Sequence, residues 1–409
     1  MQTLKFNYYD EFACTGPECE DTCCQHWKIF LTKSEYMNFK KMDCSPELRA
    51  TLDSSFKRVK TGNETQYAKV EFREDGKCPL FGEDGLCMLQ KEKGESALTF
   101  VCSVFPRNWS QIGGSVAAFT LTPTCYHVVE LLMQHPEGLV LSEEEYDRKN
   151  KYINQNRYAG KIIAPDSKIL PYIWTIKTAQ LDILQNRNFT ISERLLILGY
   201  YTNKLREYLS NSPEKIASLS SMMLDNELIT KIADSLKAPQ DDVQAAAKTY
   251  DMLFKLIEFK RRTSPVGHTA KLLGTVADSV GLTYQYRDDG QTEVSWNIEP
   301  YVKNRDIFRK IEEERPYIIE NLLVNLSFSQ FSEEEKLIWS DYFALVALYN
   351  FLKVGTAAFL PENYTDKDLA MALTNIVKML INTNLTAFTL MNFAQQGMDT
   401  LPYIAFLVS

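Results

Sequence analysis

Residues 14–24 read Cys14-Thr15-Gly16-Pro17-Glu18-Cys19-Glu20-Asp21-Thr22-Cys23-Cys24. This run opens a segment that holds all nine cysteines of the 409-residue chain: Cys14, Cys19, Cys23, Cys24, Cys44, Cys78, Cys87, Cys102 and Cys125. Residues 126–409 contain none. The cysteines therefore belong to one local cysteine-rich region, and the function of the chain depends on what their sulfur atoms bind.

Three kinds of cysteine site are compatible with this count. Disulfide frameworks are typical of small secreted domains, but the first residues lack the apolar run and cleavage site of a signal peptide. Structural zinc usually takes closely spaced cysteine pairs, and the chain has no Cys-x2-Cys. A [4Fe–4S] cluster takes four cysteines and accepts them from distant loops. The sequence favours the cluster and leaves zinc as the alternative metal.

Two further motifs narrow the choice. Residues 78–87 read Cys-Pro-Leu-Phe-Gly-Glu-Asp-Gly-Leu-Cys, and residues 102–107 read Cys-Ser-Val-Phe-Pro-Arg. Together with the Cys-x4-Cys-x3-Cys-Cys run, they resemble the flagellin lysine N-methylase family of flagellated bacteria. The chain is more distantly similar to a broad group of small zinc- or iron-chelating proteins. The resemblance covers residues 6–125, and beyond residue 135 only a helical tail of similar length is recognised.

The resemblance implies a bacterial cytosolic enzyme that transfers methyl groups from S-adenosylmethionine to lysines on flagellin and carries an oxygen-sensitive [4Fe–4S] cluster. Eight cysteines correspond to the family motif by position: Cys14, Cys19, Cys23, Cys24, Cys78, Cys87, Cys102 and Cys125. Cys44 has no counterpart. The chain departs from the family at Cys125-Tyr126-His127, where the family tends to have Cys-Pro-Glu.

The composition of the chain limits the classes of partner that it can bind. With 45% hydrophobic and 24% charged residues the chain can bury an ordinary core. Its net charge of −8 argues against nucleic acid, which requires a basic face, and suits a lysine-bearing partner better. The most apolar run, residues 342–360, is interrupted by Asn350, Lys353 and Gly355 and indicates a buried helix. We expect a cytoplasmic protein; peripheral membrane association and homo-oligomer formation stay open.

The expected fold class is mainly α. An irregular Cys-rich metal-binding N-terminal domain with short β elements should span residues 1–135, and an α-helical domain should span residues 136–409. In the first domain we predict a helix start at Ser45-Pro46-Glu47 and a strand within residues 66–73. Gly82 and Gly85 should form turns that bring Cys78 and Cys87 together. Gly113-Gly114 should join a hairpin whose second strand ends near Cys125.

In the second domain, apolar residues recur at helical spacing. We predict helices over residues 169–186, 191–209, 239–262, 304–325, 333–354 and 365–383. Ser142-Glu-Glu-Glu145 and Ser332-Glu-Glu-Glu335 are interpreted as capping boxes, and Arg194 as one of the polar positions of its helix. A hairpin is expected at 282–297, with Tyr284 and Tyr286 facing Val294 and Trp296.

Motifs that commonly bind S-adenosylmethionine or phosphates are absent. The sequence has neither Gly-x-Gly-x-x-Gly nor Gly-x-x-x-x-Gly-Lys-Ser/Thr. The spacing around Cys19, Cys23 and Cys24 also differs from the Cys-x3-Cys-x2-Cys of the main radical S-adenosylmethionine superfamily. Chemistry between a cluster and this donor would therefore use a different scaffold, and the sequence does not identify catalytic residues.

Several residues beside the cysteines have two interpretations. Adjacent Cys23 and Cys24 cannot easily both bind one metal, so one of them is either a buried thiol or a ligand of a second centre. Cys44 is interpreted as a core cysteine. His26 and His127 are either ligands, proton carriers or hydrogen-bonded structural residues.

Charged and aromatic neighbours are candidates for cofactor and substrate contacts. Arg107 is predicted to bind the cofactor, because guanidinium favours anions, with a surface ion pair as the alternative. Glu20 and Asp21 either attract the substrate ammonium or form a solvated acidic loop. Trp27 is either part of an aromatic cage or a core residue.

The function predicted from these features is a cluster-dependent lysine methyltransferase acting on flagellin. Two alternatives stay open. One is a non-enzymatic interaction module stabilised by zinc or a cluster. The other is a cysteine-based redox protein, which would oxidise reversibly without transferring methyl groups.

Overall fold

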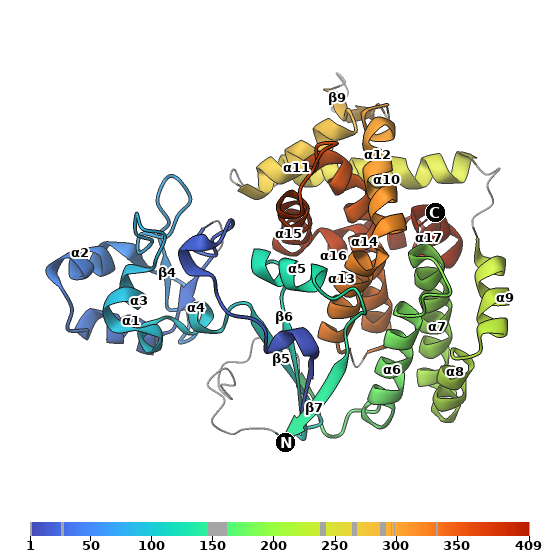
Figure 1. The fold of residues 1–409 in the computed structure, drawn as a ribbon, viewed down its shortest axis with the longest axis horizontal. Helices are drawn as coiled ribbons and strands as arrows, with labels where there is room; N and C mark the ends of the chain where they lie inside the picture. The colour runs from blue at the N-terminus through green and yellow to red at the C-terminus, as the bar shows by residue number, and fades with distance from the viewer. Residues whose placement is uncertain are drawn as a thin grey trace. The chain divides into compact units, whose positions relative to one another are not determined.

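The computed structural model describes residues 2–25, 28–145, 162–237, 243–263, 268–286, 292–295, 297, 299–332 and 334–408. The chain forms two compact units and is mainly helical, as predicted (Figure 1). The cysteine unit comprises Phe12–Arg107 and Cys125–His127; the helical unit comprises Met1–Glu11, Asn108–Thr124 and Val128–Ser409. Segments from both sides of residue 135, the expected domain boundary, thus contribute to the helical unit.

The cysteine unit contains short elements. They are β2 (Phe30–Leu31), α1 (Lys33–Lys41), α2 (Pro46–Ser55), β3 (Phe56–Arg58), β4 (Ala68–Val70), α3 (Met88–Lys93) and α4 (Phe100–Val104). The strands form a small sheet in the order β2-β4-β3. The predicted helix start is confirmed, since the Ser45 hydroxyl accepts a hydrogen bond from Leu48 N and Pro46 opens α2.

A small apolar core holds these elements together. Leu31, Leu48, Leu52 and Leu89 are each at most 1% exposed. Burying side chains of this size contributes about 1.5–3 kcal/mol each. Cys78 is part of this core, so at least one cysteine is anchored in the centre of the unit.

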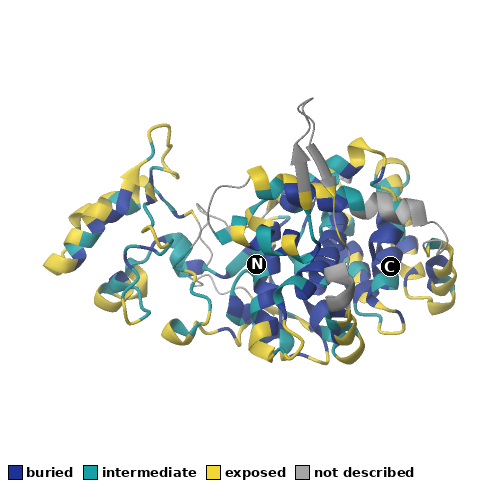
Figure 2. Ribbon diagram, turned by 90° about the horizontal axis from the view of Figure 1, so that it is seen from above, coloured by how far each residue is buried: buried dark blue, intermediate teal, exposed yellow. Residues whose placement is uncertain are grey.

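The helical unit begins with a sheet and continues with helices. Its elements, with α5 starting in the cysteine unit, are β1 (Gln2–Phe6), β5 (Arg107–Ile112), β6 (Val116–Leu121), α5 (Tyr126–Met133), β7 (Leu141–Glu145), β8 (Ile162–Ile163), α6 (Ile173–Leu184), α7 (Ile191–Asn211), α8 (Ile216–Met222), α9 (Asn226–Leu236), α10 (Val243–Thr263), α11 (His268–Ser279), β9 (Thr283–Tyr286), β10 (Thr292–Ser295), α12 (Glu299–Glu314), α13 (Pro316–Ser329), α14 (Glu335–Phe359), α15 (Asp366–Asn382), α16 (Leu385–Gln395) and α17 (Leu401–Val408). Figure 2 shows buried residues along the inward faces of these helices.

The five-stranded sheet is mixed, in the order β7-β1-β6-β5-β8. Strand β1 is parallel to β6 and antiparallel to β7. The predicted hairpin turn is confirmed: Gly113 and Gly114 have φ of +59° and +74° between β5 and β6, which glycine adopts without strain. Strand β6 ends at Leu121, earlier than expected.

The capping box predicted at residues 142–145 is wrong. These residues form the edge strand β7, which pairs with β1 in the register Leu4↔Glu143. Glu144 makes an ion pair with Lys5 at 2.8 Å. Strand pairing and this ion pair outweigh a helical pattern that is only local.

The region predicted as one helix over 304–325 is two helices. Arg315 has non-helical angles, φ −139° and ψ 52°, and Pro316 opens α13, because proline has no N–H to continue the preceding helix. The second predicted capping box is also wrong. Glu334, not Ser332, occupies the N-cap of α14, while the Ser332 hydroxyl donates to the Asp341 carboxylate.

Helix α14 is the centre of the helical unit and contacts α7, α11, α12, α13, α15, α16 and α17. Among the described residues, its stretch Leu337–Phe359 alone is long and apolar enough to cross a membrane, and 78% of its most apolar window is buried inside the protein. This agrees with the interpretation of residues 342–360 as a core helix.

The hairpin expected at 282–297 is confirmed in its strands. β9 and β10 are antiparallel, with Tyr284 opposite Val294 and Tyr286 opposite Thr292. Trp296 lies outside the described residues.

Lys353 of α14 carries a testable pH dependence. Burial lowers the pKa of its ammonium to about 8, although nearby Glu312 opposes the shift. Nζ donates to the Leu407 carbonyl at 3.4 Å and lies 5.5 Å from the Tyr349 ring centroid. Because the folded pKa lies below the unfolded value of 10.5, the unfolded state binds the extra proton between pH 8 and 10.5. The contribution of Lys353 to stability should rise by up to about 3 kcal/mol as pH rises through this window.

Urea unfolding of Lys353→Met and the parent at pH 7.5 and pH 10 tests this expectation. The variant should be the more stable protein at pH 7.5, and this advantage over the parent should shrink by most of that contribution at pH 10. Burial also raises the pKa of Glu312 and of the Cys78 and Cys102 thiols, so only the difference between the parent and the variant is assigned to Lys353. An unchanged slope in Lys353→Met would show that other groups cause it.

Candidate metal centre

All nine cysteines lie in the cysteine unit and none is in a disulfide, so they form no disulfide framework. Five of them contact the same apolar core: Cys78 within it, and Cys24, Cys44, Cys87 and Cys102 packed against it. The remaining four are not part of that set. The core group thus includes Cys24 from the first motif, while Cys14, Cys19 and Cys23 of that motif lie outside it.

The turn between Cys78 and Cys87 has the predicted form. Gly85 N donates to Gly82 O at 3.1 Å, and Gly85 has φ of +77°. Phe81 and Cys87 then pair as a β-bridge, which folds the loop back on itself. A Cβ at Gly85 would lie 3.1 Å from Pro17 Cβ. The glycine therefore allows the second motif to pack closely against the first.

Backbone pairing fixes Cys24 beside Cys78. Cys78 N donates to Cys24 O at 2.8 Å, and Gln25 forms a β-bridge with Lys77. Chain segments more than fifty residues apart are thereby joined at two cysteines. The short Cys-x-x-Cys spacing of common zinc sites is replaced by a contact between distant segments.

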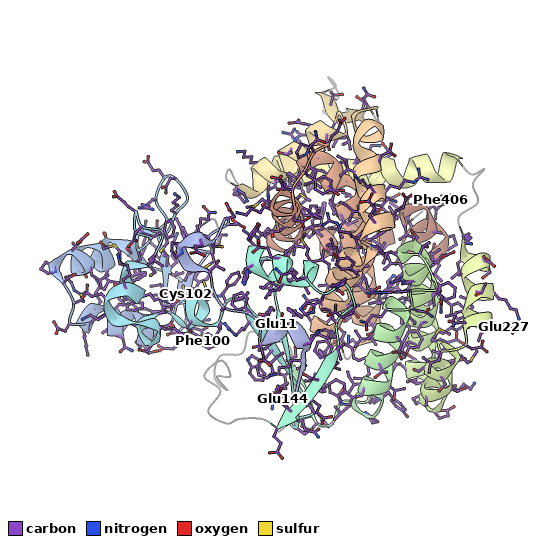
Figure 3. The ribbon with its side chains drawn as sticks, in the orientation of Figure 1. Glu11, Phe100, Cys102, Glu144, Glu227 and Phe406 are labelled. Carbon is purple, nitrogen blue, oxygen red and sulfur yellow. The ribbon has the colours of Figure 1, made fainter. Side chains whose placement is uncertain are left out.

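Cys102 is placed by capping interactions. It lies on α4, whose N-cap Thr99 accepts a hydrogen bond from Cys102 N at 3.2 Å (Figure 3). Glu35 of α1 accepts from Phe100 N at 2.8 Å and from Thr32 N at 2.8 Å. One carboxylate thus caps α1 and attaches α4 to it, which holds Cys102 against the core.

Four thiols influence one another electrostatically. The pKa of Cys102 is raised to about 12, chiefly by burial and to a smaller extent by neighbouring Cys24, Cys78 and Cys87. The pKa of Cys78 is also raised to about 12 by burial, with contributions from Cys24 and Cys87. For Cys87 burial raises the pKa and Cys24 adds to the effect. Cys24, Cys78, Cys87 and Cys102, here called the thiol quartet, therefore occupy one neighbourhood.

The cysteines of the first motif form a more exposed group. Cys14 and Cys23 are exposed, and Cys19 is half-buried. Burial raises the pKa of Cys19, with a smaller contribution from Cys14. A hydrogen bond between the Cys23 and Cys24 side chains lowers the pKa of Cys24 to about 7 and raises that of Cys23. The adjacent pair therefore has unequal members: Cys24 packs against the core, while Cys23 interacts electrostatically with Cys102 as well as with Cys14.

The four thiols of the quartet are the kind of ligand that a thiolate-ligated centre uses, but their side chains are not arranged as a coordination sphere. Within the described ranges, no three His, Cys, Asp or Glu side chains form a group that could hold a metal as they stand. Four thiols from three separate segments nevertheless share one neighbourhood, and a [4Fe–4S] cluster requires this number and kind of ligand. Thiols lose their protons when metal binds.

Cys44 and Cys125 lie outside the quartet. Cys44 packs against the core, as expected of a core cysteine, and its sulfur lies 3.5 Å from Arg49 Nη2. Cys125 is half-buried just before α5. The role of Cys125 as a ligand stays a prediction.

Arg107 lies with two aromatic neighbours. Its Nη2 donates to the Phe12 carbonyl at 3.4 Å, and its guanidinium lies 5.0 Å from the centroid of the Phe12 ring. The His127 ring lies 5.7 Å from the same ring, tilted by 47°. The predicted cofactor residue and a predicted histidine are thus brought together at Phe12.

The other neighbours of the first motif have separate positions. Asp21 accepts from Gln25 Nε2 at 3.2 Å, and its carbonyl accepts from the Cys19 thiol at 3.4 Å. Glu20 is exposed. His26 and Trp27 lie outside the described residues. The substrate-contact interpretations of these residues stay predictions.

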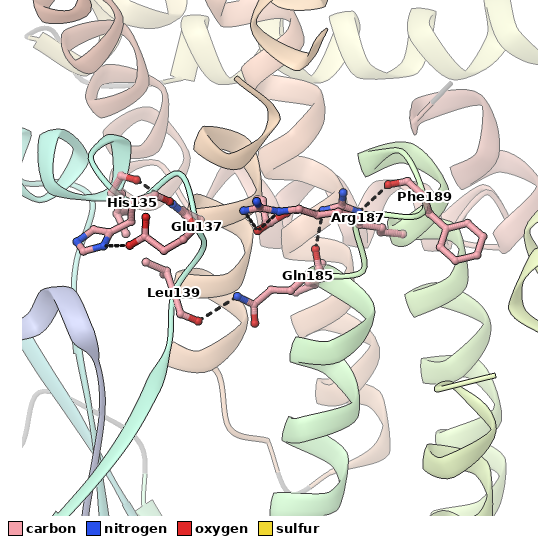
Figure 4. Close-up of polar contacts among 11 residues, drawn as sticks. His135, Glu137, Leu139, Gln185, Arg187 and Phe189 are labelled. Carbon is pink, nitrogen blue, oxygen red and sulfur yellow. Dashed lines mark hydrogen bonds and ion pairs between the residues drawn. The ribbon is translucent and has the colours of Figure 1, made fainter. Parts of the chain in front are cut away.

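One buried ionic cluster was not anticipated from the sequence. Glu320 is 1% exposed and pairs with Arg194 at 2.7 Å and Arg187 at 2.8 Å. Arg194 also donates to the carbonyls of Leu184 and Phe189 (Figure 4). Arg194, expected at one of the polar positions of its helix, is buried at 4% exposed. Its only sequence signal was an arginine directly before the apolar run at residues 195–198.

Comparison with known proteins supplies an independent finding. The family model "FliB lysine N-methylase C-terminal domain" matches residues 178–407. The chain is 31% identical over 140 residues to lysine-N-methylases of Salmonella typhimurium and Salmonella choleraesuis, in each case over 34% of both chains. It is 30% identical over 141 residues to the flagellar biosynthetic protein FliU of Salmonella muenchen, covering 34% of this chain and 80% of FliU. The alignment thus spans about a third of the two methylases. No solved structure matches.

Proposed function

We infer the function from one premise: the chain belongs to the FliB lysine N-methylase family, whose C-terminal domain model covers more than half of its length. We propose that it methylates lysine side chains of flagellin, with S-adenosylmethionine as donor and a [4Fe–4S] cluster in the cysteine unit. The names of the relatives support the methylation of lysine and the link to flagella.

The thiol quartet is the observation that carries the cluster proposal. We assign Cys24, Cys78, Cys87 and Cys102 as the ligands, because Cys78 lies in one apolar core, the other three pack against that core, and the thiols interact electrostatically. When bound, a cluster of this kind supplies iron that can coordinate a ligand or exchange electrons. The chain would contribute the thiolates and the apolar core against which the cysteines pack.

Methyl transfer places its own demands on the chain. The substrate ammonium must lose a proton before its nitrogen lone pair can attack the methyl carbon. The carbon–sulfur bond of the donor then breaks, and the donor leaves as a neutral thioether. In the cysteine unit, exposed Glu20 is the carboxylate that we propose holds the incoming ammonium, while Asp21 accepts from Gln25. Arg107 is proposed to contact the carboxylate of the donor.

Metal and sulfide analysis of protein purified without oxygen tests the cluster. About four irons and four sulfides per chain, with broad visible absorption, are expected. Methylation of lysines on purified flagellin, measured with and without S-adenosylmethionine, tests the activity. One tightly bound zinc and a colourless sample would overturn the cluster and leave a structural metal module.

A redox function is the second candidate, and the Cys23–Cys24 pair favours it. A thiol whose pKa is lowered to about 7 is partly thiolate near neutral pH and therefore more readily oxidised. If the parent protein reversibly lost two titratable thiols on oxidation and transferred no methyl groups, this candidate would be supported over the methylase.

A further inference from the structure

Two cysteines of the thiol quartet each have a threonine hydroxyl beside them. Cys24 N donates to Thr22 Oγ1 at 3.2 Å, and Cys102 N donates to Thr99 Oγ1 at 3.2 Å. In both pairs the hydroxyl oxygen is the acceptor of this bond, so its single hydrogen can be donated to another atom. The same arrangement thus occurs at two of the four assigned ligands.

The atom that receives each hydroxyl hydrogen is the sulfur of the same cysteine. A hydrogen bond from Cys23 lowers the pKa of the Cys24 thiol, burial opposes this effect, and the Thr22 hydroxyl adds to it. Burial raises the pKa of the Cys102 thiol, and the Thr99 hydroxyl opposes the rise. A hydrogen bond has this direction when it is donated to the thiolate. Both hydroxyls therefore stabilise negative charge on a quartet sulfur.

Helix capping explains only one of the two contacts. Thr99 is the N-cap of α4, where a hydroxyl oxygen commonly accepts a hydrogen bond from the first turn of the helix. Thr22 has no such role, because Gln25 forms a β-bridge with Lys77 and the next helix that the structure describes, α1, begins at Lys33. What the two threonines share is the quartet sulfur beside the hydroxyl.

The surroundings of the two hydroxyls strengthen their hydrogen bonds. Thr99 is 5% exposed, and Thr22 is half-buried. A hydrogen bond in such surroundings is electrostatically stronger than one in water. The Glu35 carboxylate, which accepts from Phe100 N, holds the residue that follows Thr99. The hydroxyl of Thr99 is therefore held in place by the fold and requires no rearrangement to donate to the sulfur.

We propose that Thr22 and Thr99 are positioning residues of the metal centre, each donating a hydrogen bond to a ligand sulfur and thereby raising the reduction potential of the cluster. This inference rests on the proposed [4Fe–4S] cluster. Hydrogen bonds to the sulfurs are among the factors that set the potential of such a cluster. An added electron increases the negative charge on the sulfurs, so a donated hydrogen bond is stronger in the reduced state and favours it.

A redox titration of the holoprotein purified without oxygen tests this role. Dithionite supplies the electrons, and visible absorption and electron paramagnetic resonance follow reduction against mediators of known potential. Thr99→Val keeps the shape of the side chain and removes the hydroxyl, so the midpoint potential should become more negative by up to about 59 mV, a tenfold change in a one-electron equilibrium. Thr22→Val should shift it in the same direction. Thr99→Ser keeps the hydroxyl and should have the potential of the parent.

Two control substitutions separate this role from a structural one. Ser45→Ala removes the N-cap of α2 in the same unit and should lower the melting temperature without changing the potential. Thr15→Val removes a hydroxyl that hydrogen-bonds to the Cys19 thiol, which lies outside the quartet, and should also leave the potential unchanged. The proposal is overturned if Thr22→Val and Thr99→Val lower only the melting temperature, or if Thr15→Val shifts the potential equally.

Cobalt binding keeps this test separate from the test of the cluster. If the parent holds no iron, the cluster proposal fails, and Co²⁺ added to the protein then reports on the same hydrogen bonds. Groups that hydrogen-bond to metal ligands tune the metal, so the thiolate-to-cobalt absorption band should move to longer wavelength in Thr22→Val and Thr99→Val and not in Thr15→Val. A parent that binds no Co²⁺ through its thiols, or bands that coincide in all these variants, would overturn the role of the threonines.

Discussion

Cys102→Ser is expected to abolish iron binding, whereas Cys44→Ser should retain the iron content of the parent. Both sulfurs pack against the same apolar core, so the two substitutions disturb it similarly. Cys102 belongs to the thiol quartet, while Cys44 lies beside Arg49. Removing one of four thiolates leaves an iron without its protein ligand, and the cluster should not survive purification.

The measurement is iron and sulfide per chain, together with the visible spectrum, on protein prepared without oxygen. Cys24→Ser, Cys78→Ser and Cys87→Ser should behave like Cys102→Ser. Cys14→Ser and Cys19→Ser should keep most of the iron, because these cysteines lie outside the quartet. If a Cys14 or Cys19 variant lost its iron while Cys24→Ser kept it, the assigned ligand set would be wrong.

Glu320→Ala is expected to destabilise the helical unit by about 3–5 kcal/mol, the cost of breaking a buried ion pair. The substitution leaves the Arg194 guanidinium, which is 4% exposed, without its carboxylate. The remaining hydrogen bonds from Arg194 to Leu184 O and Phe189 O should keep the loss toward the lower end. Arg187 is nearly half exposed and can be hydrated instead.

Urea unfolding followed by far-ultraviolet circular dichroism measures this loss. Glu313→Ala is the matched control, since Glu313 pairs with Arg309 on the surface of α12 with both side chains more than two-thirds exposed. It should change stability by less than about 1 kcal/mol. Equal effects of the two substitutions would show that the Glu320 cluster adds no more than a surface pair.

Local patterns predicted many elements correctly. Ser45 and Pro46 begin α2, Gly85 turns the loop between Cys78 and Cys87, and Gly113-Gly114 joins β5 to β6. In each case the deciding chemistry, a hydroxyl cap or a positive φ, acts within a few residues. The family was recognised from the cysteine motifs, while the matching family model covers the helices at residues 178–407.

Predictions failed where distant segments compete with local preference. Residues 142–145 have the sequence pattern of a helix start, but they pair with β1, which lies more than 130 residues away in sequence. The Ser332 hydroxyl bonds Asp341 and not the helix backbone. Capping energies of about 1 kcal/mol are smaller than the combined effect of strand pairing and burial.

The sequence alone determined that the chain has one cysteine-rich region followed by a mainly helical region, since cysteine positions and helical periodicity are local properties. Only the tertiary structure decided which cysteines lie near one another. The backbone hydrogen bond from Cys78 to Cys24 joins the first two motifs, and Glu35 accepts from Phe100 N and so attaches α4, which carries Cys102. The tertiary structure likewise decided that Arg194 is buried against Glu320. Long-range pairing of this kind depends on how whole elements pack, and no spacing in the sequence encodes it.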